Sequence, residues 1–207
     1  MTTNFNTIIE AAREGAAEDV KYFIDKGVDV NAKSEDGWTP LHAAAKNNRN
    51  FEVLKYLIEK GADVNAKYEG RTPLRCAASK NPNIEIVKYL FEQGAEVSEK
   101  YEYGQTLLHC AALGNSNIEV LKYLIEKGAD IDAKDDYGCT PLHKAAGYTT
   151  NVEVVKYLVE QGADINAKDN DGETPIEAAC NDNLFNGYVE VWNYLNSLNA
   201  DANANEN

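Results

Sequence analysis

The nine residues GWTPLHAAA, at positions 37–45, decide the fold of this 207-residue chain, because their pattern returns at a fixed interval. The string Gly-x-Thr-x-(Leu/Ile) occurs five times, with steps of 33, 34, 34 and 34 residues, and starts at Gly37, Gly70, Gly104, Gly138 and Gly172. A second string, Gly-(Ala/Val)-(Asp/Glu)-(Val/Ile), is interleaved with the first and starts at Gly27, Gly61, Gly94, Gly128 and Gly162. Two series in one register indicate an internal repeat, which predicts stacked units that share a continuous core.

The repeated string is typical of the start of a short, thin helix. Thr39 is a good N-cap, because its hydroxyl can accept a hydrogen bond from a free backbone N–H, and Pro40 suits the first helical position. The alanines at 43–45 keep this helix narrow, so that neighbouring units can approach closely. A turn follows at 47–49, where we expect an asparagine in the left-handed conformation that ends a helix.

A second helix is predicted at 51–58, with Asn50 as its N-cap. Gly61 ends this helix, and residues 63–70 are extended and turn-like, which predicts a β-hairpin finger leading to the next threonine. Four apolar residues at helical spacing form the buried stripe of the second helix: Val53, Leu54, Leu57 and Ile58.

The period divides residues 1–198 into a single domain of six units. A unit of about 34 residues cannot bury enough surface to fold alone, so the end units must depart from the pattern to cap the stack. The last unit has a longer turn at 181–187, and residues 199–207 are a polar, low-complexity tail. We expect an N-terminal capping repeat at 1–33 and further repeats at 34–67, 68–100, 101–134, 135–168 and 169–198.

The repeated strings resemble those of the ankyrin repeat family. The matching strings are Gly-Trp-Thr-Pro-Leu-His (37–42), its counterparts at 70–75, 104–109, 138–143 and 172–177, and Gly-Ala-Asp-Val-Asn-Ala (61–66). The resemblance covers about residues 5–198. It implies an all-α solenoid, an alpha-alpha superhelix of six stacked helix pairs with β-hairpin fingers. It also implies that the chain binds proteins through its concave face and finger tips.

The net charge of −14 argues against a nucleic-acid partner, because an acidic surface repels phosphate backbones, and it favours a protein partner with a basic surface. No apolar run approaches the roughly 18–20 residues that span a bilayer, so no membrane partner is expected. The first six residues lack the basic region of a secretory signal, and four cysteines are too few for a disulfide scaffold. We expect a monomer in the cytoplasm; the alternative is secretion into a host cell as an effector.

Residue types that carry catalysis or metal binding are spread along the repeat. His42, His109 and His143 share one register, and each is expected to order its own helix turn by hydrogen bonding. Equivalent positions in successive units lie about 8–10 Å apart. This is too far for shared metal ligation, and Cys76 and Cys110 would exceed the ~7 Å limit for a disulfide. No cofactor, metal or catalytic site is therefore expected, and an enzyme or a small-molecule receptor is the least favoured function.

The candidate binding residues are those that differ between units, because the scaffold does not dictate them. Positions beside the finger glycines carry aromatic and arginine side chains, the commonest interface anchors. They flank turns rather than apolar stripes, which argues against a role in the core. The predicted contact residues are Trp38, Tyr68, Arg71, Tyr101, Tyr103, Tyr137 and Tyr148.

Two rows of lysine also follow the repeat. The finger row, which either offsets nearby acids or meets acidic groups on a partner, comprises Lys33, Lys67, Lys100, Lys134 and Lys168. The other row is followed each time by tyrosine and is typical of a solvated helix edge: Lys21, Lys55, Lys88, Lys122 and Lys156. Taken together, the pattern favours a protein-interaction module, that is, an adaptor, an inhibitor or a host-directed effector. The alternative is a structural spacer or one part of a larger assembly.

Overall fold

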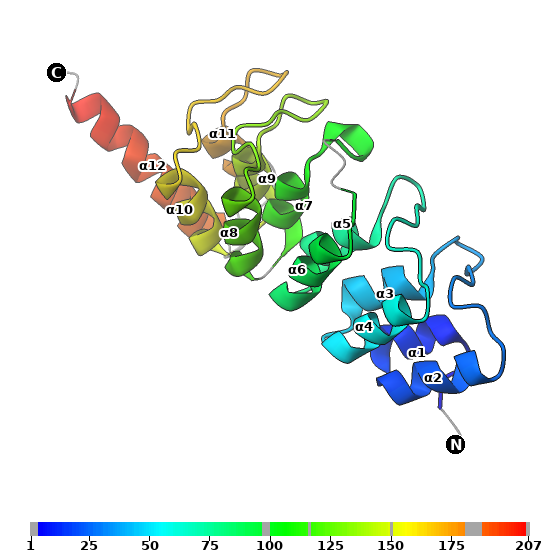
Figure 1. Ribbon diagram of the computed structural model, residues 1–207. Coiled ribbons are helices and arrows are strands. Elements are labelled where there is room, and N and C mark those ends of the chain that lie inside the picture. Colours follow the sequence, from blue (N-terminus) through cyan, green and yellow to red (C-terminus); the bar gives the residue numbers. More distant parts are fainter. Residues whose placement is uncertain (1–3, 97–99, 116, 150, 181–187, 206–207) are drawn as a thin grey trace. The chain divides into compact units, whose positions relative to one another are not determined.

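The computed structural model describes residues 4–96, 100–115, 117–149, 151–180 and 188–205. The chain divides into two compact units, residues 1–98 and 99–207. In both units the regular secondary structure of the described residues is helical, and no strand is assigned among them (Figure 1). The predicted all-α class is therefore confirmed. The long turn at 181–187 lies outside the described residues.

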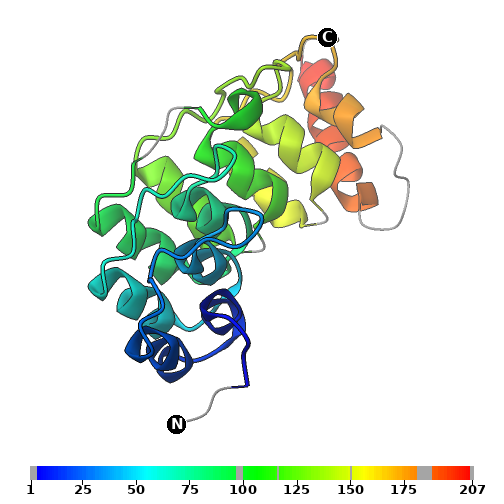
Figure 2. The same ribbon diagram turned by 90° about the vertical axis from the view of Figure 1, so that its right-hand side faces the viewer.

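In the first unit the helices form two layers (Figure 2). α1, α3 and α5 pack on one another, and α2, α4 and α6 form the second layer, each packed on its own first helix. The bounds are α1 Ile8–Glu14, α2 Ala17–Asp25, α3 Pro40–Asn47, α4 Phe51–Glu59, α5 Pro73–Lys80 and α6 Ile84–Glu92.

The second unit has the same plan, with α7, α9 and α11 in one layer and α8, α10 and α12 in the other. A short 3-10 turn, η1, precedes α7. The last helix continues to Asn205, into the segment assigned from sequence to the tail, because Leu198 is followed by alternating alanine and polar residues with no glycine or proline. The bounds are η1 Glu102–Gly104, α7 Leu107–Gly114, α8 Ile118–Glu126, α9 Pro141–Tyr148, α10 Val152–Glu160, α11 Pro175–Cys180 and α12 Tyr188–Asn205.

The helices begin at the capping residues that the sequence predicts. Thr39 Oγ1 accepts from the His42 N–H at 3.4 Å at the start of α3, and Asn50 Oδ1 accepts from the Glu52 N–H at 3.1 Å at the start of α4. The alanines at 43–45 are fully buried, which makes α3 thin enough for α1 and α5 to pack on either side of it.

The asparagine between two paired helices does not have the predicted left-handed conformation. Asn48 has φ −81° and ψ 122°, which is extended, and its side chain is buried. Its Nδ2 donates to the carbonyls of Ala12 and Gly15 in the preceding pair, at 3.0 and 2.9 Å. Its Oδ1 accepts from the Asn50 N–H at 2.8 Å. The asparagine is thus an interior link between successive helix pairs. Because its φ is negative, this position does not need a glycine.

Replacing Asn81, which makes the same link one pair later, is expected to destabilise the first unit. Asn81 is fully buried, and its Nδ2 donates to the carbonyls of Ala45 and Asn48, each at 2.9 Å. Asn81→Ala leaves these groups buried without that donor, so we expect a loss of about 1–3 kcal/mol in the free energy of unfolding, measured by urea denaturation. The control is Asn47→Ala, an exposed asparagine, which should change stability by less than about 0.5 kcal/mol. Equal effects of the two variants would contradict the linking role.

Candidate protein-binding surface

All the candidate contact residues except Tyr148 lie in or beside tight loops that precede the first helix of each pair. Tyr148, expected from sequence near a finger glycine, is instead the last residue of α9, at the opposite end of that helix from the loop. In both units these loops extend away from the helices (Figure 1). Each loop is closed by backbone hydrogen bonds, and in the first unit Tyr68 and Arg71 exchange two of them as an isolated β-bridge. The other closing bonds run from Ser34 N–H to Trp38 C=O (2.9 Å), Tyr101 to Gln105 (2.7 Å), Asp135 to Cys139 (3.0 Å) and Asp169 to Glu173 (3.0 Å).

Histidines tie three of the five loops to the helix of the preceding repeat. The Nε2 atom of His42 lies 3.0 Å from the Arg71 carbonyl, and that of His109 lies 2.9 Å from the Cys139 carbonyl. A carbonyl only accepts, so Nε2 carries the proton, while Nδ1 accepts from the N–H of the capping threonine. The predicted ordering of the helix turn is present, and the imidazole also holds the loop of the following repeat. His143 makes the equivalent bond to the Glu173 carbonyl at 3.0 Å.

Because of these histidines, we expect the folded chain to lose stability in mild acid. Burial lowers the pKa of both His42 and His109 below the ordinary value of 6.5, although hydrogen bonds to backbone carbonyls oppose this shift. The unfolded chain therefore binds more protons below pH 6.5, and the free energy of unfolding falls as the pH decreases through this region. We expect a positive slope of stability against pH between about 5 and 6.5, measured by urea denaturation. The slope should be smaller in the double variant His42→Gln/His109→Gln; an unchanged slope would show that other groups cause it.

Two exposed tyrosines form the most prominent aromatic feature of the second unit. The side chains of Tyr103 and Tyr137 are 61% and 56% exposed, and their ring centroids lie 6.1 Å apart. Their loops are joined directly, because the Asp136 N–H donates to the Tyr103 carbonyl at 2.9 Å. Tyr103 itself has φ 58°, a left-handed conformation that costs a non-glycine residue about 1–3 kcal/mol. The fold therefore holds this ring outward on a fixed backbone.

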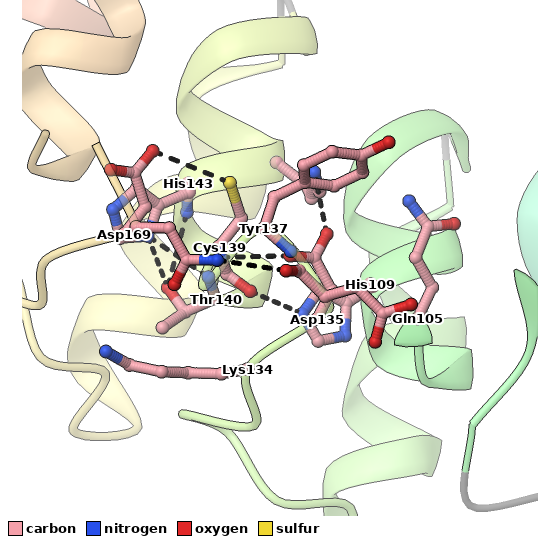
Figure 3. Close-up of polar contacts among 12 residues, drawn as sticks. Gln105, His109, Lys134, Asp135, Tyr137, Cys139, Thr140, His143 and Asp169 are labelled. Carbon is pink, nitrogen blue, oxygen red and sulfur yellow. Dashed lines mark hydrogen bonds and ion pairs between the residues drawn. The ribbon is translucent and has the colours of Figure 1, made fainter. Parts of the chain in front are cut away.

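A buried ion pair between Asp135 and Lys144 of α9 stabilises the Tyr137 loop. Asp135 Oδ1 accepts from the N–H groups of Tyr137 and Cys139, at 2.9 and 3.0 Å (Figure 3). Its Oδ2 lies 2.8 Å from Lys144 Nζ on α9, and the side chains of the two partners are 0% and 11% exposed. The same Nζ lies 5.7 Å from the centroid of the Tyr137 ring. One charged pair thus fixes both the backbone and the ring of this loop.

Burial and charge act in opposite directions on the pKa values of this cluster. Burial lowers the pKa of Lys144, but the hydrogen bond to Asp135 and nearby negative charge raise it, and the net direction is upward. Lys144 is therefore held as a cation. Burial raises the pKa of the Cys139 thiol, although the charge of Lys144 opposes this, so the thiol is not activated as a nucleophile.

Tyr101 and Tyr148 differ in their suitability as contact residues. Tyr148 is 64% exposed at the end of α9. Tyr101, in contrast, is only 9% exposed, so its ring cannot offer a partner the area that we expected from sequence. It occupies the same register as Asp135, and its backbone closes the Tyr103 loop by hydrogen bonds with Gly104 and Gln105.

In the first unit the structure brings the remaining candidates together. The ring centroids of Trp38 and Tyr68 lie 6.2 Å apart, and Lys46 Nζ lies 4.9 Å from the centroid of the Trp38 ring. Arg71 follows in the Tyr68 loop. All three predicted residues, Trp38, Tyr68 and Arg71, are half-buried.

Three of the five finger lysines make contacts between successive loops. Lys100 Nζ donates to the Lys134 carbonyl at 3.2 Å, and Lys134 Nζ donates to the Lys168 carbonyl at 2.7 Å. Lys67 pairs with Glu96 at 3.4 Å. These contacts give the row a role in holding adjacent loops, beside the two alternatives that the sequence left open.

The four cysteines are distributed unevenly: Cys76 and Cys110 are buried, Cys139 is half-buried and Cys180 is exposed. Within the described ranges, no three His, Cys, Asp or Glu side chains gather as metal ligands would. Among the helices described, none is both long enough and apolar enough to cross a bilayer.

The Lys144–Asp135 pair was not predicted from sequence. A signal was available, because the register of Lys144 is occupied in the other repeats by small residues, Ala43, Cys76, Cys110 and Ala178. A lysine among small, buried residues needs a partner. The repeat alone does not say which of the nearby acids provides it.

Comparisons with known proteins agree with this geometry. The sequence profile of a family described as ankyrin repeats (3 copies) matches residues 8–101 and 108–206. The regulatory subunit 12A of protein phosphatase 1, from Mus musculus and Rattus norvegicus, is 60% identical to this chain over 35 residues, 17% of the chain and 3% of those proteins. An ankyrin repeat protein of Acanthamoeba polyphaga mimivirus is 49% identical over 41 residues, 20% of the chain and 32% of that protein.

The chain therefore spans only a small part of the curated relatives that it matches. The family match, however, covers most of its own length, and the capped helix pairs and histidine-tied loops follow the same repeat. This chain belongs to the ankyrin repeat family.

Proposed function

We propose that this chain is a protein-interaction module that binds a protein partner through its loops and the adjoining edge of its first helices. The observation that carries the proposal is the pair of exposed rings of Tyr103 and Tyr137, held 6.1 Å apart on loops with a fixed backbone. Rings that are ordered before binding offer contact area at low entropic cost. Ankyrin repeats generally mediate protein–protein interaction. In this proposal six stacked helix pairs form the solenoid, and the loops act as its β-hairpin fingers.

The charge of the second unit supports a partner with a basic surface. Residues 99–207 hold 7 Lys and Arg against 19 Asp and Glu, a net charge of −12. Residues 1–98 hold 13 against 15, a net charge of −2. A basic partner would therefore be attracted towards the tyrosine pair, with association that slows as salt increases. We propose a cytoplasmic monomer that acts as an adaptor or inhibitor, or as an effector after export into a host cell. The mouse and rat relatives, named as regulatory subunits, fit a module that acts by binding.

An affinity pull-down with quantitative mass spectrometry tests this proposal. The baits are the full chain, the double variant Tyr103→Ala/Tyr137→Ala and the control Lys122→Ala, each used with lysate of the source cells. We expect at least one protein to be enriched by the full chain and by Lys122→Ala but not by the double variant. Identical recoveries with all three baits, or no enriched protein, would favour the structural-spacer alternative instead.

A further inference from the structure

The first unit contains a small hollow of about 210 Å³ whose lining is strongly basic. It lies between the end of α3, the Tyr68–Arg71 loop and α5. Trp38 provides one aromatic wall. No carboxylate is among the described residues that line the hollow. Four of these residues are cationic: Lys46, Arg71, Arg75 and Lys80.

This concentration of positive charge is unusual for the chain. Four of the 20 Lys and Arg residues surround one hollow, although the net charge is −14. Within the described part of the chain, neither Lys46 nor Lys80 makes an ion pair with a carboxylate, and Lys46 instead lies over the Trp38 ring at 4.9 Å. Like charges gathered in this way raise the local potential and attract an anion.

The Trp38 ring and the size of the hollow indicate which kind of anionic ligand would fit there. Trp38 is half-buried and contacts the Tyr68 ring, so a ligand in the hollow meets an apolar surface as well as the cations. The volume of the hollow is below the roughly 300–1,000 Å³ of pockets that enclose drug-sized ligands, so it suits side chains rather than a whole small molecule. Asp36 and Glu69 are exposed in the two adjoining loops and would repel an extended anionic surface such as a membrane.

We infer that this hollow binds an acidic peptide segment of the protein partner, with carboxylates on Lys46 and Lys80 and an aliphatic side chain against Trp38. The inference rests on the proposed function and adds a local specificity to it. The second unit would attract basic surface, whereas this hollow selects an acidic segment. A partner with both features would bind in one orientation, because the opposite orientation places like charges together.

The test uses the full chain and a defined probe. The variant Trp192→Phe leaves Trp38 as the sole tryptophan, so its fluorescence reports on the hollow. The probe is the blocked hexapeptide Glu-Leu-Glu-Glu-Leu-Glu, and its counterpart with glutamine at each acidic position is the control. We expect saturable binding of the acidic peptide, with binding of the glutamine peptide weaker by at least about tenfold, because hydrogen bonds to charged groups contribute about 1.5–3 kcal/mol.

Charge reversal at the hollow provides the second arm. Lys46→Glu and Lys80→Glu should each weaken the acidic peptide by at least about tenfold, measured by calorimetry, with folding checked by circular dichroism. Lys60→Glu is the matched control, because Lys60 also lies over an aromatic ring, Tyr56 at 5.4 Å, but does not line the hollow. We expect less than about a twofold change from it.

Three outcomes would overturn the inference: no saturable binding of the acidic peptide, equal binding of the two peptides, or equal weakening by Lys60→Glu and Lys46→Glu. Binding to phosphatidylserine vesicles that depends on Lys46, without binding to the peptide, would assign the hollow to a membrane surface and also overturn it. The proposed function is tested separately, because loss of partner recovery by Tyr103→Ala/Tyr137→Ala does not involve the hollow.

Discussion

Replacing Lys144 with methionine is expected to lower the free energy of unfolding by about 3–5 kcal/mol, measured by urea denaturation. Methionine keeps most of the length of the side chain but removes the charge. The Asp135 carboxylate, which is 0% exposed and 2.8 Å from Lys144 Nζ, would remain buried without its counter-ion. The cost of an uncompensated buried charge exceeds that of a lost surface contact, because water cannot replace the missing partner.

The exposed pair between Lys122 and Glu119 provides the control for this prediction. Its N–O distance is 2.7 Å, similar to that of the buried pair, but its side chains are 38% and 54% exposed. Lys122→Met should therefore cost no more than about 1 kcal/mol. If Lys144→Met and Lys122→Met cost the same, the buried pair does not stabilise the loop.

The residues at the equivalent positions of the first unit suggest a double variant. It should recover most of the free energy of unfolding that Lys144→Met loses. Ser34 and Ala43 occupy the registers of Asp135 and Lys144, and Ser34 Oγ accepts from the Trp38 N–H at 3.0 Å. Asp135→Ser/Lys144→Ala transfers this uncharged pair to the second unit. The double variant has no buried charge at these two positions. We therefore expect it to be more stable than Lys144→Met, in which the buried Asp135 carboxylate has no counter-ion. A double variant less stable than Lys144→Met would argue that the pair has a positive role beyond mutual neutralisation.

The features that were predictable from sequence are those that depend on neighbouring residues along the chain. Thr39 and Asn50 cap helices through atoms two or three residues away, so the repeat is enough to identify them. Asn48 looked like a helix terminator, because its partners, the carbonyls of Ala12 and Gly15, belong to another repeat and become visible only once the helices are stacked.

The candidate site was predictable in part for the same reason. Tyr103 and Tyr137 flank their loop glycines on the outer side and are exposed, as expected. Tyr101 also lies near a glycine, but in a register that faces inward, and the alternation of inner and outer positions in such a tight turn follows from its closing hydrogen bonds. The Lys144 contact requires the loop to fold back on α9, which no local pattern encodes.

The largest expected effect on binding is at the tyrosine pair. Tyr103→Ala and Tyr137→Ala should each weaken the partner by about 2–4 kcal/mol, a factor of roughly 30 to 1,000 in affinity. Each ring is more than half exposed before binding, so a partner can bury a large aromatic area on it. The rings are also fixed, because adjacent loop backbones are hydrogen-bonded and the Tyr137 loop rests on the Asp135–Lys144 pair. Little ordering entropy therefore opposes binding.

Substitutions in the row of lysines that are each followed by tyrosine, on the second helices, should leave binding of the partner nearly unchanged. Lys122 and Lys156 pair with Glu119 and Glu153 on their own helices, and the lysine side chains are 38% and 39% exposed. Lys122→Ala and Lys156→Ala should change affinity by no more than about 1 kcal/mol.

Calorimetric titration of the recovered partner against four variants shows whether the loops and first helices form the binding surface. These are Tyr103→Ala, Tyr137→Ala, Lys122→Ala and Lys156→Ala, each with its melting temperature checked. We expect the two tyrosine variants to bind at least about 30-fold more weakly than the parent chain, and the two lysine variants to bind like it. If both tyrosine variants bind like the parent chain and the lysine variants lose binding, the partner contacts the second helices and not the loops.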